Sequence, residues 1–283
     1  CRYDTWTEPC AIVDAFIVAS QLWQHTGKAE YRDDAERIYY NAICLAQRSN
    51  GGFGLENSPG KANNTHSVTM NCDEAHWCCT MRGGEGLGRA AEFTAFKKDN
   101  ELALPFFRDV NVYEKIAGGD VWMDMTTAYP FGSGVSVKIK AAPRKKITLA
   151  LEKASWMKEY VVKVNGKNVK YSEADGLAKI TRRFKAGDDV AVSFQMAPHF
   201  VGMLNAENSN AGDFRVMYGP LVLGCTVGEN GNVAYGEEFD GSVKDAFKGK
   251  KSGVELSPIY HLMSPKVNMA AKPAFSRRIV FTR

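Results

Sequence analysis

The side chains with the clearest chemical potential in this sequence are its cysteines, because six of the seven lie within the first 79 residues. An odd number of cysteines concentrated in one region is not the pattern of a disulfide framework. The neighbours Cys78 and Cys79 cannot form a disulfide with each other without severe strain. The cysteines therefore favour a metal site or a reactive thiol over a covalent cross-link.

Two short motifs place suitable metal ligands at close spacing: Glu8-Pro9-Cys10 and the adjacent pair Cys78-Cys79. Glu8 and Cys10, at i and i+2, can approach one ion from the start of a helix, where Pro9 is favoured. Zinc accepts thiolate sulfur at about 2.3 Å and carboxylate oxygen at about 2.0–2.2 Å, usually in a tetrahedron. We therefore predict a zinc site formed by Glu8, Cys10, Cys78 and Cys79. A purely structural zinc site or a group of buried free thiols remains an alternative, because the motifs lack Cys-x-x-Cys spacing.

Other residues near these motifs allow more than one interpretation. His76 is a candidate donor to a zinc ligand or an ordinary loop histidine, and Cys72 is a spare ligand or a loop thiol. Cys44 lies beside apolar residues and Cys225 follows a predicted strand, so both are expected in the core. The glycine-rich stretch 84–88 follows a cysteine pair rather than a strand, which predicts close packing rather than a phosphate-binding loop.

Hydrophobic periodicity indicates helices in the first hundred residues. A helix that ends before Gly27 is predicted from apolar residues at i, i+4, i+7 and i+11, namely Ile12, Phe16, Ala19 and Trp23. The buried face of a second helix is predicted to comprise Tyr31, Ala35, Ile38, Ala42 and Leu45. Residues 54–71, rich in Asn, Gly, Ser and Thr, predict a loop. A third helix is expected to begin soon after Cys79 and to end near Phe93.

The pattern changes after about residue 100, where apolar and polar residues alternate with a period of two. Strands are predicted over residues 121–127, 135–140, 147–152, 161–164, 167–170, 178–184, 190–194, 214–218, 221–223 and 278–281. Asn165-Gly166 is a strong signal for a hairpin turn. Short strands at this spacing predict an antiparallel β-sandwich. Trp122 and Trp156 are candidates for stacking on a sugar, although such residues more often fill a sandwich core.

The composition limits the classes of partner. The chain has 283 residues, is 45% hydrophobic and 24% charged, and carries a net charge of +4 with no basic stripe. Nucleic acid is therefore not an expected partner, and no apolar run is long enough for a membrane span. The sequence begins at Cys1 without a signal peptide, so we expect the middle of a longer gene product rather than a processed end. Oligomeric state and compartment, periplasmic or cytoplasmic in a bacterium, stay open.

The order of these motifs resembles glycoside hydrolase family 127, the β-L-arabinofuranosidases and their relatives. Glu-x-Cys at residues 8–10 is followed by a predicted helical hairpin, a predicted loop and Cys-Cys at residues 78–79. The segments 161–166, 185–189 and 217–223 resemble the sandwich that follows the catalytic barrel of that family. The resemblance covers most of the chain, from Glu8 to about residue 225.

The resemblance implies a multidomain α plus β fold. Residues 1–100 would be the C-terminal helices of an (α/α)6-barrel catalytic domain, and residues 101–283 a β-sandwich region, with a further break near 200–225 left open. It also implies a zinc ion held by Glu8, Cys10, Cys78 and Cys79. Cys78 would be the nucleophile of a retaining mechanism. The family's acid/base Glu lies upstream of the Glu-x-Cys motif, so this chain is expected to lack it.

One departure from the family's pattern concerns the substrate. The family often has Pro-Pro-Asn after the paired cysteines, whereas this sequence has Thr80-Met81-Arg82, so the sugar and its linkage stay open. The first functional hypothesis is a retaining, zinc-dependent glycosidase whose partner is a carbohydrate related to an arabinofuranoside. The alternative is a non-catalytic fragment or carbohydrate-binding module with a structural zinc site.

Overall fold

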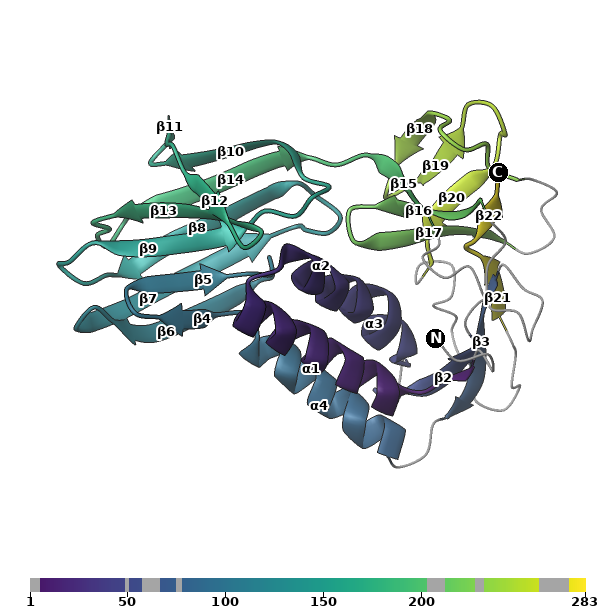
Figure 1. Ribbon diagram of the computed structural model, residues 1–283, viewed down its shortest axis with the longest axis horizontal. Helices are drawn as coiled ribbons and strands as arrows, with labels where there is room; N and C mark the ends of the chain where they lie inside the picture. Colours follow the sequence, from purple (N-terminus) through teal and green to yellow (C-terminus); the bar gives the residue numbers. More distant parts are fainter. Residues whose placement is uncertain are drawn as a thin grey trace. The chain divides into compact units, whose positions relative to one another are not determined.

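The computed structural model describes residues 6–48, 51–57, 67–74, 78–202, 212–226, 232–259 and 275–283. The fold is mixed α/β, with few helices and mostly sheets (Figure 1). Within these residues, no helix has both the length and the apolar character needed to cross a bilayer. The chain forms two compact units: the first comprises Cys1–Ile17, Ala35–Gly88 and Ala197–Arg283, and the second comprises Val18–Asp34 and Arg89–Met196.

The helices lie in the N-terminal part of the chain. They are α1 (Pro9–Thr26), α2 (Ala29–Ile38), the π-helical segment η1 (Tyr39–Ile43), α3 (Cys44–Ala46) and α4 (Cys78–Glu92). The predicted first helix is confirmed, and its four apolar face residues Ile12, Phe16, Ala19 and Trp23 are all buried. It ends before Gly27, which has a φ of +69°. The second predicted helix is α2 continued by η1 and α3, and the third begins at Cys78, slightly earlier than predicted.

The first unit contains an eleven-stranded sheet. Eight strands follow the order β1-β2-β3-β21-β17-β20-β19-β18, while β16 pairs with β15, β17 and β22. The strands are β1 (Trp6–Thr7), β2 (Gly54–Asn57), β3 (Ser67–Glu74), β15 (Pro198–Gly202), β16 (Asp213–Tyr218), β17 (Leu221–Thr226), β18 (Phe239–Ser242), β19 (Ala246–Gly249), β20 (Glu255–Pro258), β21 (Phe275–Arg278) and β22 (Phe281–Thr282).

The prediction of a loop over residues 54–71 is wrong for the part of that segment that the structure describes. β2 and β3 pair with each other, and β3 also pairs with β21, which lies near the end of the sequence. Hydrogen bonds to so distant a strand hold the segment extended, and local composition cannot indicate such a partner. The predicted strand 278–281 is also divided, because Arg278 ends β21 and Phe281 begins β22.

The second unit contains two sheets. The six-stranded sheet, in the order β11-β10-β14-β8-β7-β6, comprises β6 (Val110–Ile116), β7 (Gly119–Thr127), β8 (Gly134–Ala141), β10 (Lys158–Val164), β11 (Lys167–Asn168) and β14 (Asp189–Gln195). The five-stranded sheet, in the order β12-β13-β9-β5-β4, comprises β4 (Phe96–Lys98), β5 (Glu101–Leu104), β9 (Ile147–Glu152), β12 (Ser172–Ala174) and β13 (Leu177–Arg182). The strands predicted between residues 121 and 194 are confirmed, although the one predicted over residues 167–170 is limited to Lys167–Asn168. Asn165 and Gly166 form a turn with φ values of +51° and +77°.

The expectation of purely antiparallel pairing is wrong at one place in the second unit. β5 and β9 are parallel, with Leu102 opposite Leu149. The strands between them in the sequence, β6 to β8, belong to the other sheet, so the chain leaves the five-stranded sheet and returns in the same direction. Parallel neighbours require such a crossover, which period-two alternation in the sequence does not indicate.

Strand β9 shows how the second unit is packed. All of its residues except Thr148 are buried, so it lacks the alternation of a half-exposed strand. Ala150 belongs to a buried cluster with Trp23 of α1 and Leu177 of β13. The hydroxyl of Tyr160, in the six-stranded sheet, donates a hydrogen bond to the carbonyl of Glu152 at 2.6 Å. β9 is therefore covered by other parts of the second unit on both of its faces.

Candidate metal centre

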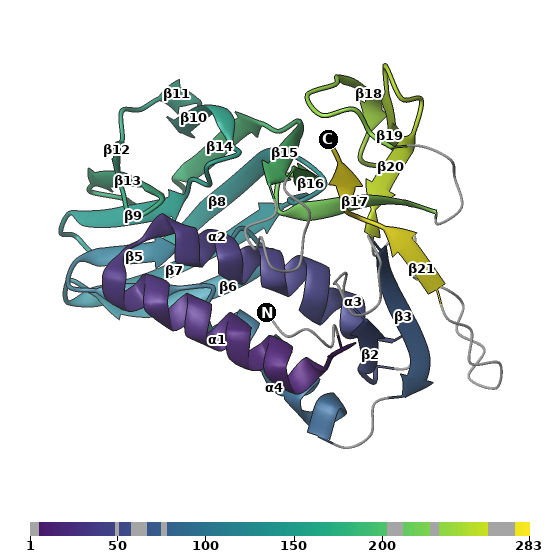
Figure 2. The same cartoon turned by 45° about the vertical axis from the view of Figure 1, so that its right-hand side comes forward.

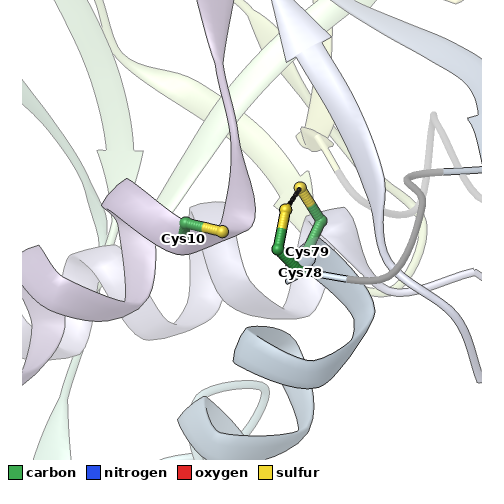
Figure 3. Close-up of side chains that lie close together, drawn as sticks. All are labelled: Cys10, Cys78 and Cys79. Carbon is green, nitrogen blue, oxygen red and sulfur yellow. Dashed lines mark hydrogen bonds between the residues drawn. The ribbon is translucent and has the colours of Figure 1, made fainter.

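Three of the predicted ligands lie together in the first unit. The Sγ atoms of Cys10, Cys78 and Cys79 all lie within 4.8 Å of one another (Figure 3). The Sγ atoms of Cys78 and Cys79 are 3.9 Å apart. We call these three side chains the thiol cluster. Their chemistry and spacing could hold a metal ion.

The thiol cluster is formed by the starts of two helices. Pro9 and Cys10 are the first two residues of α1, and Cys78 and Cys79 are the first two of α4. In Figure 3, Cys10 extends from one of these helices toward the paired cysteines of the other. The first turn of a helix has unpaired N–H groups and the positive end of the helix dipole. Both helices therefore favour negative charge on the sulfur atoms.

The three thiols differ in their access to solvent. Cys79 is 5% exposed, Cys10 is half-buried and Cys78 is exposed. Cys78 is thus the member of the thiol cluster that a molecule in solution can reach most easily. Cys79, in contrast, is placed to contact only other parts of the protein or an ion within the cluster.

Crowding and burial oppose ionisation of the inner thiols. Burial raises the pKa of Cys79 to about 12, with further contributions from its hydrogen bond to Cys78 and from the charge of Cys10. Burial also raises the pKa of Cys10, and the neighbouring Cys78 and Glu8 add to this effect. A bound divalent cation would lower these pKa values instead, because it would be the largest charge in the site and would favour the thiolate forms.

Glu8, the fourth predicted ligand, lies directly before α1. Its backbone carbonyl accepts a hydrogen bond from the N–H of Ile12 at 3.1 Å, which begins the hydrogen-bonding of the helix. Within the described residues, its carboxylate is not part of the group of atoms that lie within 4.8 Å of one another. Its charge nevertheless acts on Cys10. The role of Glu8 as a ligand stays a prediction.

Comparison with known proteins identifies a family for this chain. The model of the GH127 catalytic domain of β-L-arabinofuranosidase matches residues 2–92, and that of the GH127 middle domain matches residues 102–196. This chain belongs to glycoside hydrolase family 127. The two matches together cover about two thirds of it. The thiol cluster lies entirely within the region that matches the catalytic domain.

The relatives of this GH127 chain are considerably longer than the chain itself. It is 23% identical over 230 residues to the non-reducing end β-L-arabinofuranosidase of Bifidobacterium longum subsp. longum, covering 76% of this chain and 34% of that protein. A solved GH127 β-arabinofuranosidase has a TM-score of 0.71 and 18% identity, over 98% of this chain and 49% of the other. A GH127 β-L-arabinofuranosidase from Geobacillus stearothermophilus T6 has a TM-score of 0.73 and 17% identity, over 99% and 50%. The chain therefore spans about one third to one half of these relatives and shares the fold of the solved ones.

Close packing of α4 fixes the position of the paired cysteines. The α1 and α4 helices run side by side in both views (Figures 1 and 2). A Cβ atom added at Gly86 would lie 2.7 Å from Val13 of α1, and one added at Gly83 would lie 2.2 Å from the ring of Phe53. Residues 84–88 lie inside α4, so they do not form a phosphate-binding loop. The predicted role of these glycines in close packing is confirmed at Gly86 and is wrong at Gly84 and Gly88, where an added Cβ atom would meet nothing within 4 Å.

Arg82 is a positioning residue that the sequence did not single out. It lies in the segment that departs from the family's Pro-Pro-Asn pattern, and it forms ion pairs with Asp14 of α1 and Glu85 of α4. The spacing of Arg82 and Glu85, at i and i+3, was the available signal for the second pair. The pair with Asp14 depends on the approach of two helices that are distant in sequence. Arg82 thus connects the two helices whose starts form the thiol cluster.

The remaining candidate residues have different outcomes. Cys225 is buried, as predicted, while Cys44 is only half-buried. His76 lies outside the described residues. Cys72 belongs to β3, but its side chain lies outside the described part of the structure.

Proposed function

We propose that this chain contains the thiolate half of the active site of a retaining, zinc-dependent glycoside hydrolase that acts on a β-L-arabinofuranoside. The observation that carries the proposal is the convergence of Cys10, Cys78 and Cys79 within 4.8 Å at two helix starts. Membership of family 127 and the name of the Bifidobacterium relative support the substrate class. The acid that protonates the leaving group would come from outside this sequence.

The thiol cluster fits zinc in both chemistry and spacing. Thiolate sulfur suits zinc. In a tetrahedral site with Zn–S bonds of about 2.3 Å, two sulfur atoms are about 3.8 Å apart. The 3.9 Å between the Sγ atoms of Cys78 and Cys79 agrees with this value. Glu8 is the proposed fourth ligand, because it is two residues from Cys10 and its charge already acts on that thiol. Bound zinc would hold the coordinated thiols deprotonated at neutral pH.

Cys78 is the proposed nucleophile because it is exposed, whereas Cys79 is buried. Its Sγ atom attacks the anomeric carbon, so that a C–S bond forms while the C–O bond to the leaving group breaks. The leaving oxygen takes a proton from the external acid. Water then attacks the same carbon and gives a proton to the external residue, which now acts as a base, while the C–S electron pair returns to Cys78 as a thiolate. Two displacements at one carbon give retention of configuration.

The finer description of the fold is part of the same proposal. We infer that residues 1–100 are the C-terminal helices of an (α/α)6 barrel and that residues 101–283 are a β-sandwich region. The ends of the two family matches, at residues 92 and 102, support a boundary near residue 100.

The test uses the native protein that contains this chain, with an aryl β-L-arabinofuranoside as substrate. The Cys78→Ser variant should lose activity by about a thousandfold or more, as is typical for removal of a nucleophile. Cys44→Ser is the matched control, because Cys44 is a half-buried cysteine outside the thiol cluster. Unchanged turnover in Cys78→Ser would refute the nucleophile assignment. Zinc well below one equivalent in the native protein would refute the metal assignment.

The alternative function, a non-catalytic chain with a structural zinc site, is favoured by one observation. Cys79 is buried, as a ligand in a closed structural site would be. This alternative predicts that Cys78→Ser lowers thermal stability and zinc content, while native protein and variant are equally inactive on the aryl arabinofuranoside.

A further inference from the structure

Two large aromatic side chains lie exposed on the six-stranded sheet of the second unit. Tyr113 of β6 is 61% exposed and Trp122 of β7 is 49% exposed. They are directly opposite each other in the antiparallel register, so their side chains are neighbours on one face. We call them the aromatic pair. Trp156, the other tryptophan considered for sugar stacking, is buried.

The aromatic pair faces away from the core of its sheet. Val112 and Ile116 of β6 are buried, as are Val121 and Met123 of β7, whereas the residues between them are exposed or half-buried. Burial of the alternate residues therefore fixes the rings on the outer face.

A β-bulge lies at Trp122. Against β8, Trp122 is opposite Ala141 but Met123 is opposite Ile139, so Lys140 is an extra residue at this point. Bulges change the direction of nearby side chains and are common beside functional sites. Lys140 also forms an ion pair at 3.1 Å with Asp124, which belongs to the same strand as Trp122.

Charged groups of both signs surround the two rings. The carboxylate of Asp120 raises the pKa of the Tyr113 hydroxyl, and Asp120 is directly opposite Lys115 in the strand register. With the Lys140–Asp124 pair and with Lys138, which is exposed and directly opposite Asp124, the surroundings contain two carboxylates and three ammonium groups. The charges of this surface largely offset each other, which complements an uncharged ligand that offers many hydroxyl groups.

A hollow adjoins the aromatic pair and shares two of these residues. It has a volume of about 640 Å³ and is lined by Lys97, Asp99, Lys115, Asp120 and the turn between β6 and β7. Small-molecule sites typically have volumes of about 300–1,000 Å³. The surface thus combines flat rings with an adjacent hollow lined by hydrogen-bonding groups.

We propose that the aromatic pair and the adjoining hollow form a non-catalytic binding surface for a neutral oligosaccharide. The C–H face of a sugar ring packs against an aromatic ring, and its hydroxyls hydrogen-bond to charged side chains such as Asp120 and Lys115. An apolar protein partner fits less well, because the cores of protein interfaces are depleted in charged residues. Nucleic acid would require an excess of positive charge. The proposal does not depend on the thiol cluster, and family 127 membership guides only the choice of test glycan.

The experiment is electrophoresis of the chain in native gels that contain soluble arabinan or arabinogalactan. Both neutral polysaccharides should retard the chain, and polygalacturonate should not. Trp122→Ala and Tyr113→Ala should each weaken binding about tenfold or more, a typical loss for a central aromatic contact. Tyr235→Ala is the matched control, because Tyr235 is a 46% exposed aromatic residue in the first unit. Cys78→Ser should bind as strongly as the native chain, whether or not the proposed catalytic function is correct.

Three results would overturn the proposal. The first is no retardation of the native chain by either neutral polysaccharide. The second is retardation of Trp122→Ala equal to that of the native chain, and the third is a loss of retardation in Tyr235→Ala equal to that in Trp122→Ala. A Trp122-dependent self-association in sedimentation, without retardation, would instead identify a contact between two copies. Trp122→Phe retains a ring and should recover most of the retardation. Thermal unfolding of the variants verifies that they fold, which is expected because both side chains are largely exposed.

Discussion

The thiol cluster and the aromatic pair are both candidate sites, but they are assembled in different ways. Cys10 and the paired Cys78 and Cys79 come from segments almost 70 residues apart, and helix packing brings them together. Tyr113 and Trp122 belong to one hairpin and become neighbours through its register alone. The thiol cluster should therefore be sensitive to changes in the packing around it, whereas the aromatic pair should respond only to local changes.

Removal of an inner thiol should produce the largest effect. In Cys79→Ala, zinc affinity should fall by about 100-fold or more, because loss of a ligand exceeds the typical effect of losing a residue that supports one. Thermal stability should fall with it, since metal binding contributes to folding. Chelator competition and metal analysis measure the affinity. Cys44→Ala is the control, and glycan retardation should stay unchanged. Full zinc retention in Cys79→Ala would show that the thiol cluster is not the metal site.

This contrast also shows what the sequence could predict. The period of apolar residues predicted α1 and its buried face, because helix periodicity is a local property. Local composition did not predict β2 and β3, because a strand near the end of the sequence completes their sheet. The parallel pairing of β5 and β9 depends in the same way on where the chain returns.

The two candidate sites also differ in how far the sequence could predict them. The residue types at Cys10, Cys78 and Cys79 are enough to indicate a shared site, because few other roles suit such a concentration of thiols. Their unequal burial could not be predicted, since it depends on how α1 and α4 meet. For Trp122 the residue type was equally visible, but a sandwich core and a sugar-binding surface use the same side chain. The exposure of Trp122 on the outer face of its sheet excludes a place in the core, and exposure depends on tertiary packing.

A change in the packing of α4 should affect the thiol cluster but not the aromatic pair. Gly83 and Gly84 are neighbours in α4, but a Cβ atom at Gly83 would meet the buried Phe53 at 2.2 Å, and one at Gly84 would meet nothing within 4 Å. Gly83→Ala should lower the free energy of unfolding by about 1–3 kcal/mol, as overpacking does. Gly84→Ala should raise it by up to about 1 kcal/mol, because alanine is a better helix former.

Urea denaturation of both variants measures these changes. If Gly83→Ala also weakens zinc binding while Gly84→Ala does not, the thiol cluster depends on the packing of α4. Equal stability of the two variants would show that Phe53 moves aside without cost. Retardation by arabinan should be the same in both.

A carboxylate in the first unit allows a test by pH. Glu237 is buried and accepts hydrogen bonds from the N–H groups of Ala234, Lys251 and Ser252 at 2.8, 2.9 and 3.0 Å, and from the Ser252 hydroxyl at 2.8 Å. Burial alone would raise the pKa of Glu237, but these hydrogen bonds outweigh it and hold the pKa below its ordinary value of 4.5. Because the pKa is lower in the folded state, the stabilisation is complete above pH 4.5 and is lost as the pH falls through the folded pKa.

The Glu237→Gln variant should lose about 1.5–3 kcal/mol near neutral pH, as expected for hydrogen bonds to a charged group. Its free energy of unfolding should also fall less steeply than that of the native chain below pH 4.5. Glu238→Gln is the control, because Glu238 is exposed and its hydrogen bond is to the flexible Lys250. Parallel pH profiles for the native chain and Glu237→Gln would contradict the assignment. Binding through the aromatic pair at neutral pH should not change.

The smallest expected effect concerns the ion pairs between α1 and α4. The side chain of Arg82 is 27% exposed and pairs with Asp14 of α1 and Glu85 of α4, whereas the Arg89–Glu92 pair lies within α4. Arg82→Ala should lower the free energy of unfolding by about 0.5–1 kcal/mol, and Arg89→Ala by about 0.3–0.5 kcal/mol, because solvent screens exposed pairs. The informative measurement is zinc affinity. Arg82→Ala should weaken it more than Arg89→Ala does, since the Arg82–Asp14 pair joins α1 to α4 and the Arg89–Glu92 pair lies within α4. Equal zinc affinity of Arg82→Ala and the native chain would mean that packing at Gly83 and Gly86 suffices to position the thiol cluster.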